Sequence, residues 1–288
     1  MNEARYYTRT GDGKTKCLLC PHFCLLESGE AGICRVRRNQ EGILVAESYG
    51  RVSALNSDPV EKKPLYHYFP GNMILSVGSY GCNFRCAWCQ NAAISQCGPG
   101  RQTASGNITP KELAEKAVSS GGIGLAYTYN EPAVWFEFMV DTARLVREAG
   151  RKNVVVTNGF INRDPLEELI DECDAFNVDL KSFSHDFYRR HTGGSLSPVL
   201  NTIQAISGRG LHLEISFLVV TGLNENPDTF RDMVAWLSKE AGSECVLHIN
   251  RYFPSWNMSN PPSPLDTLMN MKSVAEEYLD YVYLGNVH

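Results

Sequence analysis

The sequence predicts an α/β protein whose main body is a parallel sheet or partial barrel, preceded by a small cysteine-rich module. Three observations support this prediction. Short apolar, β-rich runs alternate with helical stretches after about residue 72. Prolines preceded by capping side chains recur where helices are expected to begin. The alternation of strand and helix is the rhythm of parallel βα units, and the cysteines gather in groups that suit metal binding.

The composition narrows the class of protein. The chain has 288 residues, 43% hydrophobic and 20% charged, which suits one large domain or one domain with a small appendage. Lys and Arg number 27 against 32 Asp and Glu, and no basic run could follow a phosphate backbone, so we expect no nucleic-acid partner. No run approaches the roughly 18 apolar residues of a membrane span, and the start lacks the apolar segment of a secretion signal. We therefore expect a cytoplasmic protein with no membrane partner.

The segment before residue 72 differs from the rest. It is rich in cysteine, punctuated by glycine and without a long amphipathic period, and it ends in the polar stretch DPVEKKP. We place a boundary near residues 60 to 72. Residues 1–66 are then the amino-terminal cysteine-rich module and linker, and residues 67–288 are the barrel.

The elements of the main body follow in order. Seven β-rich runs are expected as strands, at residues 73–77, 124–127, 154–156, 176–180, 213–220, 246–249 and 281–284. Helix starts are marked by four pairs, Thr109-Pro110, Asp164-Pro165, Asn226-Pro227 and Ser263-Pro264. Thr109 with Glu112 also matches a capping box.

Three cysteines follow the first strand of the main body, at Cys82, Cys86 and Cys89. These offsets share one side of a helix, which is the structural alternative. On a helix the outer two would lie about 10 Å apart along the axis, so a loop wrapped around one compact cluster explains them better. Three thiolates on a four-iron cluster leave one iron without a protein ligand, and an open iron can bind a substrate or cofactor.

A second group lies near the amino terminus, where four cysteines fall within eighteen residues: Cys17, Cys20, Cys24 and Cys34. Four thiolates suit either a closed zinc site or an additional iron–sulfur cluster, and the sequence leaves both open. Such a site has no open position, so a structural or electron-relaying role is expected. The basic residues that follow, Arg35, Arg37 and Arg38, form either a solvated face or a docking surface for a partner.

The loop GCNFRCAWCQN resembles the CxxxCxxC loop of the radical S-adenosylmethionine (radical SAM) superfamily. With CLLCPHFC, DPVEKKPLYHYFPG, AYTYNEP, VTNGF and VDLK, the chain resembles the branch that contains pyruvate formate-lyase activating enzyme and the radical SAM protein of the AmmeMemoRadiSam system. The resemblance implies a partial (β/α)6 TIM-like barrel. It also implies a 4Fe–4S cluster on Cys82, Cys86 and Cys89, the residues on which catalysis depends. The cluster binds S-adenosylmethionine (SAM) and cleaves it reductively to a 5′-deoxyadenosyl radical.

The resemblance also implies cofactor contacts. Trp88 would lie against the adenine, with core packing as the alternative. Glu131 would accept the ammonium group of SAM, although Tyr129 and Asn130 replace both glycines of the GGE motif of relatives. A helix-start acid is the alternative for Glu131, and Asn130 and Asn158 are further candidates for the ammonium.

The remaining cofactor candidates lie on later strands. Asp179 is either a polar contact or the partner of Lys181 in an ion pair. Glu214 and Ser216 share a strand face and could contact ribose or carboxylate. His248 is a contact or an ordinary half-buried histidine.

The expected function is a radical SAM enzyme related to pyruvate formate-lyase activating enzyme, which abstracts hydrogen from a small-molecule or peptide substrate. A reductant protein such as flavodoxin or ferredoxin would supply electrons. One alternative is an activase that makes a glycyl radical on a partner protein. An alternative of another class is an iron–sulfur electron-transfer protein.

Overall fold

The computed structural model describes residues 2–98, 100 and 107–287. At its centre lies an eight-stranded sheet in the order β13-β12-β11-β10-β9-β8-β7-β6. Strands β7 to β13 run parallel to one another, and β6 pairs antiparallel with β7. The strands are β6 (Ala54–Pro59), β7 (Met73–Gly78), β8 (Gly124–Tyr127), β9 (Lys152–Thr157), β10 (Ala175–Asp179), β11 (His212–Val219), β12 (Val246–Arg251) and β13 (Val282–Gly285).

The central strands are buried because both of their faces are covered. Every residue of β8 is buried, as are four of the five residues of β10. Parallel strands covered on both faces read as nearly continuous apolar runs, which is why the sequence marks them clearly. Gly124 of β8 approaches β9 so closely that a side chain there would collide with the backbone of Lys152.

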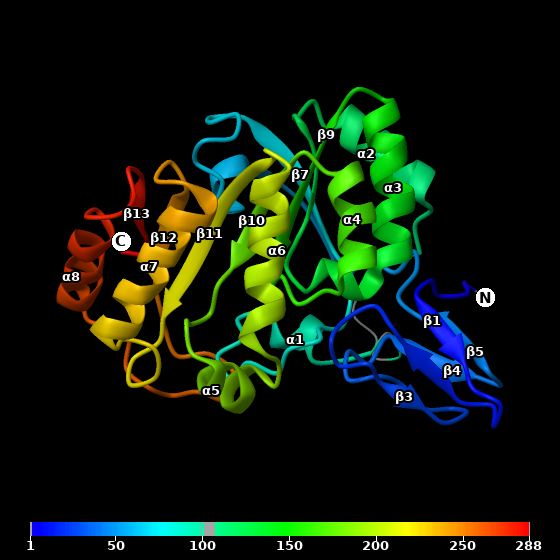
Figure 1. The fold of residues 1–288 in the computed structure, drawn as a ribbon. Coiled ribbons are helices and arrows are strands. Elements are labelled where there is room, and N and C mark those ends of the chain that lie inside the picture. The colour runs from blue at the N-terminus through cyan, green and yellow to red at the C-terminus, as the bar shows by residue number, and fades with distance from the viewer. Residues whose placement is uncertain (1, 99, 101–106, 288) are drawn as a thin grey trace.

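The helices form a layer over one face of the sheet (Figure 1). Parallel strands that follow one another in sequence and space, joined by right-handed crossovers, place their helices on the same side. The other face is partly covered by Val60 and Leu65 of the segment after β6, and the rest of it is left for a site. The main helices are α2 (Pro110–Ser119), α3 (Phe136–Glu148), α4 (Arg163–Glu172), α6 (Leu196–Gly208), α7 (Pro227–Ala241) and α8 (Leu265–Ala275). Shorter elements are α1 (Ala92–Ser95), α5 (His185–Phe187), the 3-10 turns η1 (Val60–Lys62) and η2 (Pro132–Trp135), and the π-turn η3 (Tyr188–Thr192). No helix in these described ranges is both long and apolar enough to cross a membrane.

The predicted fold class and all seven predicted strands are confirmed. Two of the four predicted helix starts are also confirmed, since Thr109 caps α2 in a capping box and Asn226 caps α7. The other two predictions were wrong by one or two residues. Helix α4 begins at Arg163, and α8 begins at Leu265 after Pro264. Ser263 does not cap α8 because its hydroxyl donates to the carbonyl of Val219, 2.5 Å away.

Strand β6 was not predicted. It lies before the expected boundary, yet it pairs with β7 along six residues, so the main sheet includes residues assigned to the linker. Its residues, ALNSDP, are exposed or half-buried. An edge strand of this kind carries no apolar alternation that the sequence could reveal.

The amino-terminal module has two small sheets. One contains β1 (Tyr7–Arg9), β2 (Thr15–Cys17) and β3 (Leu25–Leu26), and the other is the hairpin of β4 (Arg37–Gln40) and β5 (Ile43–Ala46). The module lies beside the lower ends of α3 and α4 in Figure 1. A buried ion pair joins it to α3, because Arg37 Nη1 donates to both carboxylate oxygens of Glu137 at 2.9 Å.

Candidate functional site

A cavity of about 410 Å³ lies at the carboxyl ends of the parallel strands. In α/β folds this end of the sheet is where ligands bind. Three kinds of segment line the cavity: the loop with the three cysteines, the ends of strands β8 to β13, and residues 62–64 between β6 and β7. The volume falls in the range of small-molecule sites, about 300–1,000 Å³.

The cysteine segment between β7 and α1 contains no helix, as predicted. Asn130 holds its first turn: its Oδ1 accepts from the amide of Ser79 at 2.9 Å, and its Nδ2 donates to the carbonyl of Gly81 at 2.8 Å. Gly81 has φ +82° and packs against the Cys34 carbonyl, so that a side chain there would collide with the amino-terminal module. Asn130 thus positions the loop through its side-chain amide.

All three cysteines of the loop line the cavity. Burial raises the pKa of Cys82 well above its usual value and that of Cys86 to about 12. Buried thiolates therefore need a compensating positive charge, which iron supplies to its sulfur ligands.

In the parts of the chain that the structure describes, no three His, Cys, Asp or Glu side chains converge as ligands of a single metal ion. A four-iron cluster places each cysteine on a different iron, so a wider spacing of the three sulfurs suits a cluster. The donor set and its place at the cavity wall both fit a 4Fe–4S cluster with one open iron.

Glu131 is the buried carboxylate of the cavity wall. It caps η2 by accepting from the amide of Ala133, and it also accepts from the Thr157 hydroxyl at 2.7 Å and the Asn158 amide at 2.8 Å. Burial raises the pKa of Glu131 to about 7, although these hydrogen bonds oppose the shift. The helix-start role that the sequence offered as an alternative is therefore present. One lone-pair site beside the Asn158 amide remains for a further donor.

Two more predicted residues lie at this wall. The Asn158 side chain donates to Asn83 Oδ1 at 2.8 Å and lies 3.7 Å from the sulfur of Cys82. Trp88 is 3% exposed, lines the cavity and packs against Phe187 with the ring centroids 5.7 Å apart. Trp88 thus packs in the core, which was the alternative, and also lines the cavity; its contact with the adenine stays a prediction.

Strands β10 and β11 bring further polar groups to the cavity. Asp179 and Lys181 both line it and form an ion pair at 2.9 Å, which was the alternative for Asp179. Ser216 lines the cavity as well, and its buried hydroxyl has no hydrogen-bond partner among the described residues. A buried hydroxyl without a partner is costly unless a ligand satisfies it.

Glu214 and His248 do not line this cavity. Glu214 shares the strand face of Ser216, as expected, but lies deeper in the sheet, beside Asn177 of β10. It accepts from His248 Nε2 at 2.6 Å and from the backbone amides of Tyr66 and His67 at 2.9 and 2.8 Å. The segment after β6 therefore covers the two residues, and they bind this segment.

Sequence reasoning missed Lys63, which lines the cavity with a side chain only 3% exposed. Its ammonium donates to Asp58 at 2.8 Å and lies 5.2 Å from the ring centroid of Tyr129. Tyr129 has φ +70°, an uncommon conformation for a non-glycine residue, and its hydroxyl also donates to Asp58. The segment DPVEKKP was noted as polar, but nothing in it indicated that one of two adjacent lysines turns inward.

The predicted amino-terminal group is also brought together. Its four cysteines, Cys17, Cys20, Cys24 and Cys34, line one small space against Val134. Burial raises the pKa of Cys34 to about 11 and also raises that of Cys20. The module adjoins the loop that carries Cys82, Cys86 and Cys89, which we call the cluster loop, since His22 Nε2 lies 2.7 Å from the Asn83 carbonyl oxygen. The donor set is chemically the one expected for zinc or an iron–sulfur cluster, but here too the described side chains do not converge as ligands of a single metal ion.

Residues 76–237 match the Radical SAM superfamily, and the chain belongs to this superfamily. Its members use a 4Fe–4S cluster and SAM. The uncharacterized protein MJ0808 of Methanocaldococcus jannaschii is 40% identical over 289 residues, which cover 100% of this chain and 86% of that protein.

Two further similarities bear on the expected relationship and on the fold. The pyruvate formate-lyase-activating enzyme of Clostridium pasteurianum is 24% identical over 181 residues, or 60% of this chain and 75% of that enzyme. The crystal structure of SuiB from Streptococcus suis, bound to SAM, is 12% identical with a TM-score of 0.56. That similarity covers 73% of this chain and 49% of SuiB, and it shows a shared fold.

Proposed function

We propose that the protein cleaves SAM reductively in the cavity of the cysteine loop and abstracts hydrogen from a substrate bound in the same cavity. The observation that carries the proposal is that three cysteines, a buried carboxylate and unpartnered polar groups line one space. The bound cluster would supply the electron that splits the sulfonium and generates the 5′-deoxyadenosyl radical. Cys82, Cys86 and Cys89 would hold it, leaving one iron open for SAM.

The strand ends would orient SAM. Glu131 has one free lone-pair site and would accept a hydrogen bond from the ammonium group. Lys181 and Asp179 place opposite charges in the cavity, and Ser216 offers an unpartnered hydroxyl. Trp88 would shield the adenine from water. Each role uses a group that the structure directs into the cavity wall.

The other end of the cavity suits the substrate. Lys63 has three N–H donors and a single hydrogen-bond acceptor, Asp58, among the described residues. Asn177 donates to the carbonyl of Pro64 at 2.7 Å, which turns its Oδ1 away, and that buried oxygen has no partner in the part of the chain that the structure describes. With Lys62 beside them, the two lysines outweigh Asp58 in charge. A small polar substrate with an anionic group fits these contacts.

An activase acting on a partner protein is the alternative that the similarity to pyruvate formate-lyase-activating enzyme supports. It would use the same cluster and SAM contacts, and a peptide segment would occupy the end lined by Lys63 and Asn177. The amino-terminal cysteines would hold zinc or a second iron–sulfur cluster, with a structural or electron-relaying role.

The test is a variant with alanine at all three loop cysteines, prepared anaerobically and reconstituted with iron and sulfide. It should lose SAM cleavage with dithionite as reductant, whereas the control Cys245→Ala, a buried cysteine remote from both groups in sequence, should retain it. Production of 5′-deoxyadenosine at the wild-type rate by the triple variant would refute the assignment. The metal left in this variant reports on the amino-terminal site, and finding neither zinc nor iron would contradict that site.

A further inference from the structure

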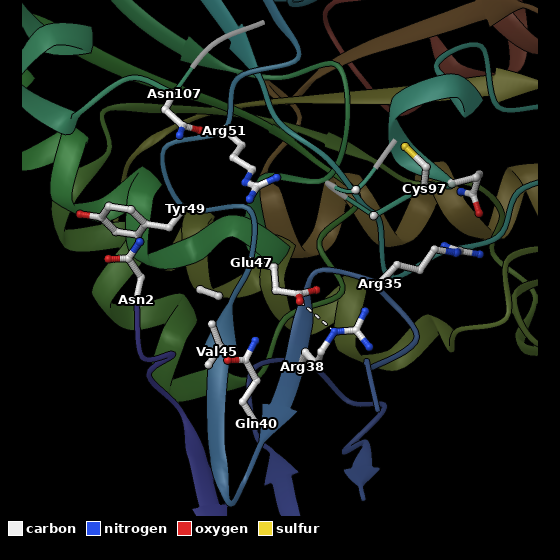
Figure 2. Close-up of a pocket in the computed structure, with 14 residues that line it drawn as sticks. Asn2, Arg35, Arg38, Gln40, Val45, Glu47, Tyr49, Arg51, Cys97 and Asn107 are labelled. Atoms are coloured by element: carbon white, nitrogen blue, oxygen red, sulfur yellow. Dashed lines mark hydrogen bonds and ion pairs between the residues drawn. The ribbon is translucent and has the colours of Figure 1, made fainter. Parts of the chain in front are cut away.

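A second, larger cavity of about 840 Å³ lies between the amino-terminal module and the segment after α1 (Figure 2). We call it the arginine groove because Arg35, Arg38 and Arg51 line it, together with one acid, Glu47. In Figure 2, Arg35 and Arg38 come from one segment, just after Cys34, and Arg51 comes from another. Its other lining side chains are mostly neutral and polar, such as Asn2, Gln40 and Gln96.

The groove is strongly basic for this protein. The four charged residues among the described lining sum to two positive charges, whereas the whole chain carries a net charge of −5. Arg38 already pairs with Glu47 at 2.8 Å and donates to the Gly29 carbonyl. Arg35 differs, because its buried Nη1 has no hydrogen-bond partner among the described residues. The described lining therefore carries net positive charge, which would attract an acidic partner.

The groove lies where the two cysteine groups meet. Arg35 directly follows Cys34, whose carbonyl packs against Gly81 at the start of the cluster loop. On the other side, the carbonyl of Arg35 lies so close to Gly98 that a Cβ there would approach it to 2.8 Å. The backbone of residues 34–35 thus contacts the segments before and after the three cysteines of the loop. A protein seated in the groove would lie beside both groups.

We propose that the arginine groove docks the acidic face of a one-electron donor protein. The proposal rests on the proposed function, because each cleavage of SAM into methionine and a 5′-deoxyadenosyl radical consumes one electron. The donor is oxidised by one electron per cleavage, and its electron enters the protein at this face. Redox encounters are weak and bury little surface, so a compact groove whose opposite charge steers the partner suits them.

The experiment compares two reductants on the reconstituted full-length protein. A reduced flavodoxin must dock, whereas dithionite is small and needs no docking surface. We expect Arg35→Glu to slow SAM cleavage driven by flavodoxin by about three- to tenfold at low salt, and by less at high salt. Dithionite-driven cleavage should not change. The dissociation constant for flavodoxin, measured by calorimetry, should rise by a similar factor.

Two further variants complete the test. Arg35→Gln removes the charge without reversing it and should give a smaller loss. Arg231→Glu makes the same charge reversal on α7, far from the groove, and should leave both reductants equally effective.

The outcomes separate the two proposals. If wild-type protein fails to cleave SAM with dithionite, the proposed function is wrong. If it succeeds and Arg35→Glu keeps the flavodoxin rate and affinity of the wild type, the docking proposal is wrong. Loss with both reductants in Arg35→Glu, or an equal loss in Arg231→Glu, would also overturn the docking proposal.

Discussion

Replacing Glu131 by Gln tests the cofactor side of the cavity most directly. The side chain keeps its size, and one oxygen can still accept from the Ala133 amide and the Thr157 hydroxyl. The new NH₂ group then faces the amide of Asn158, which now donates to the second carboxylate oxygen at 2.8 Å. Two donors would face each other. The free energy of unfolding should fall by about 1–3 kcal/mol, the cost of a buried polar group without a partner.

The affinity for SAM should fall by more than a purely structural adjustment of the cavity would cause. A hydrogen bond between an ammonium and a carboxylate contributes about 1.5–3 kcal/mol, so affinity should fall about ten- to a hundredfold.

The pH dependence follows from burial, which raises the pKa of Glu131 to about 7. Below that pH the neutral acid predominates and loses its attraction for the ammonium. Wild-type affinity should therefore decrease by up to about tenfold per unit as pH falls below 7, whereas the Gln variant should show no such slope.

The measurement is equilibrium binding of SAM at pH 6, 7 and 8 to reconstituted wild type and Glu131→Gln, with iron content determined in both. Asp164→Asn, which removes an exposed acid on α4, is the control for net charge. Equal affinities in wild type and Glu131→Gln at pH 8 would refute the reasoning. Glu131 would then serve only to cap η2, and Asn158 or another group would have to receive the ammonium.

Two further predictions concern Glu214 and Lys63. Burial raises the pKa of Glu214, but hydrogen bonds from His212, His248 and two backbone amides outweigh it and hold the pKa at about 2. The stabilisation that the ionised Glu214 provides is fully present above the pKa of a glutamate in the unfolded chain, near 4.3, and is lost as the pH falls toward 2. Glu214→Gln should lower the free energy of unfolding at pH 7 by about 3–5 kcal/mol and make that free energy less dependent on pH in the acid range. Urea denaturation from pH 3 to 7 measures both effects. A variant whose stability falls with decreasing pH as steeply as that of the wild type would contradict this reasoning. We expect inorganic phosphate, as a small anion, to raise the melting temperature of the wild type. Lys63→Met should abolish this increase, whereas Lys62→Met should retain it. Equal increases in melting temperature in the two variants would exclude Lys63 from the substrate site.

The sequence by itself determined the parts of this protein that depend on local pattern. The strands from β7 to β13 are short apolar runs because parallel strands are covered on both faces, and their order along the chain matches their order in the sheet. The cysteine triplet is equally local, since its spacing and its place after a strand indicate a cluster loop without knowledge of the rest.

Only the tertiary structure decided which groups share a space. Lys62 and Lys63 are adjacent and chemically identical, yet one is exposed and the other is held between Asp58 and Tyr129. Glu214 and Ser216 share a strand face, yet a segment nearly 150 residues earlier covers the first and leaves the second open. β6 is mostly polar and exposed, and it joins the sheet by pairing with β7. In each case the deciding contact comes from outside the segment itself: Tyr129 for Lys63, residues 66–67 for Glu214, and β7 for β6. The periodicity of one segment carries no record of what packs against it.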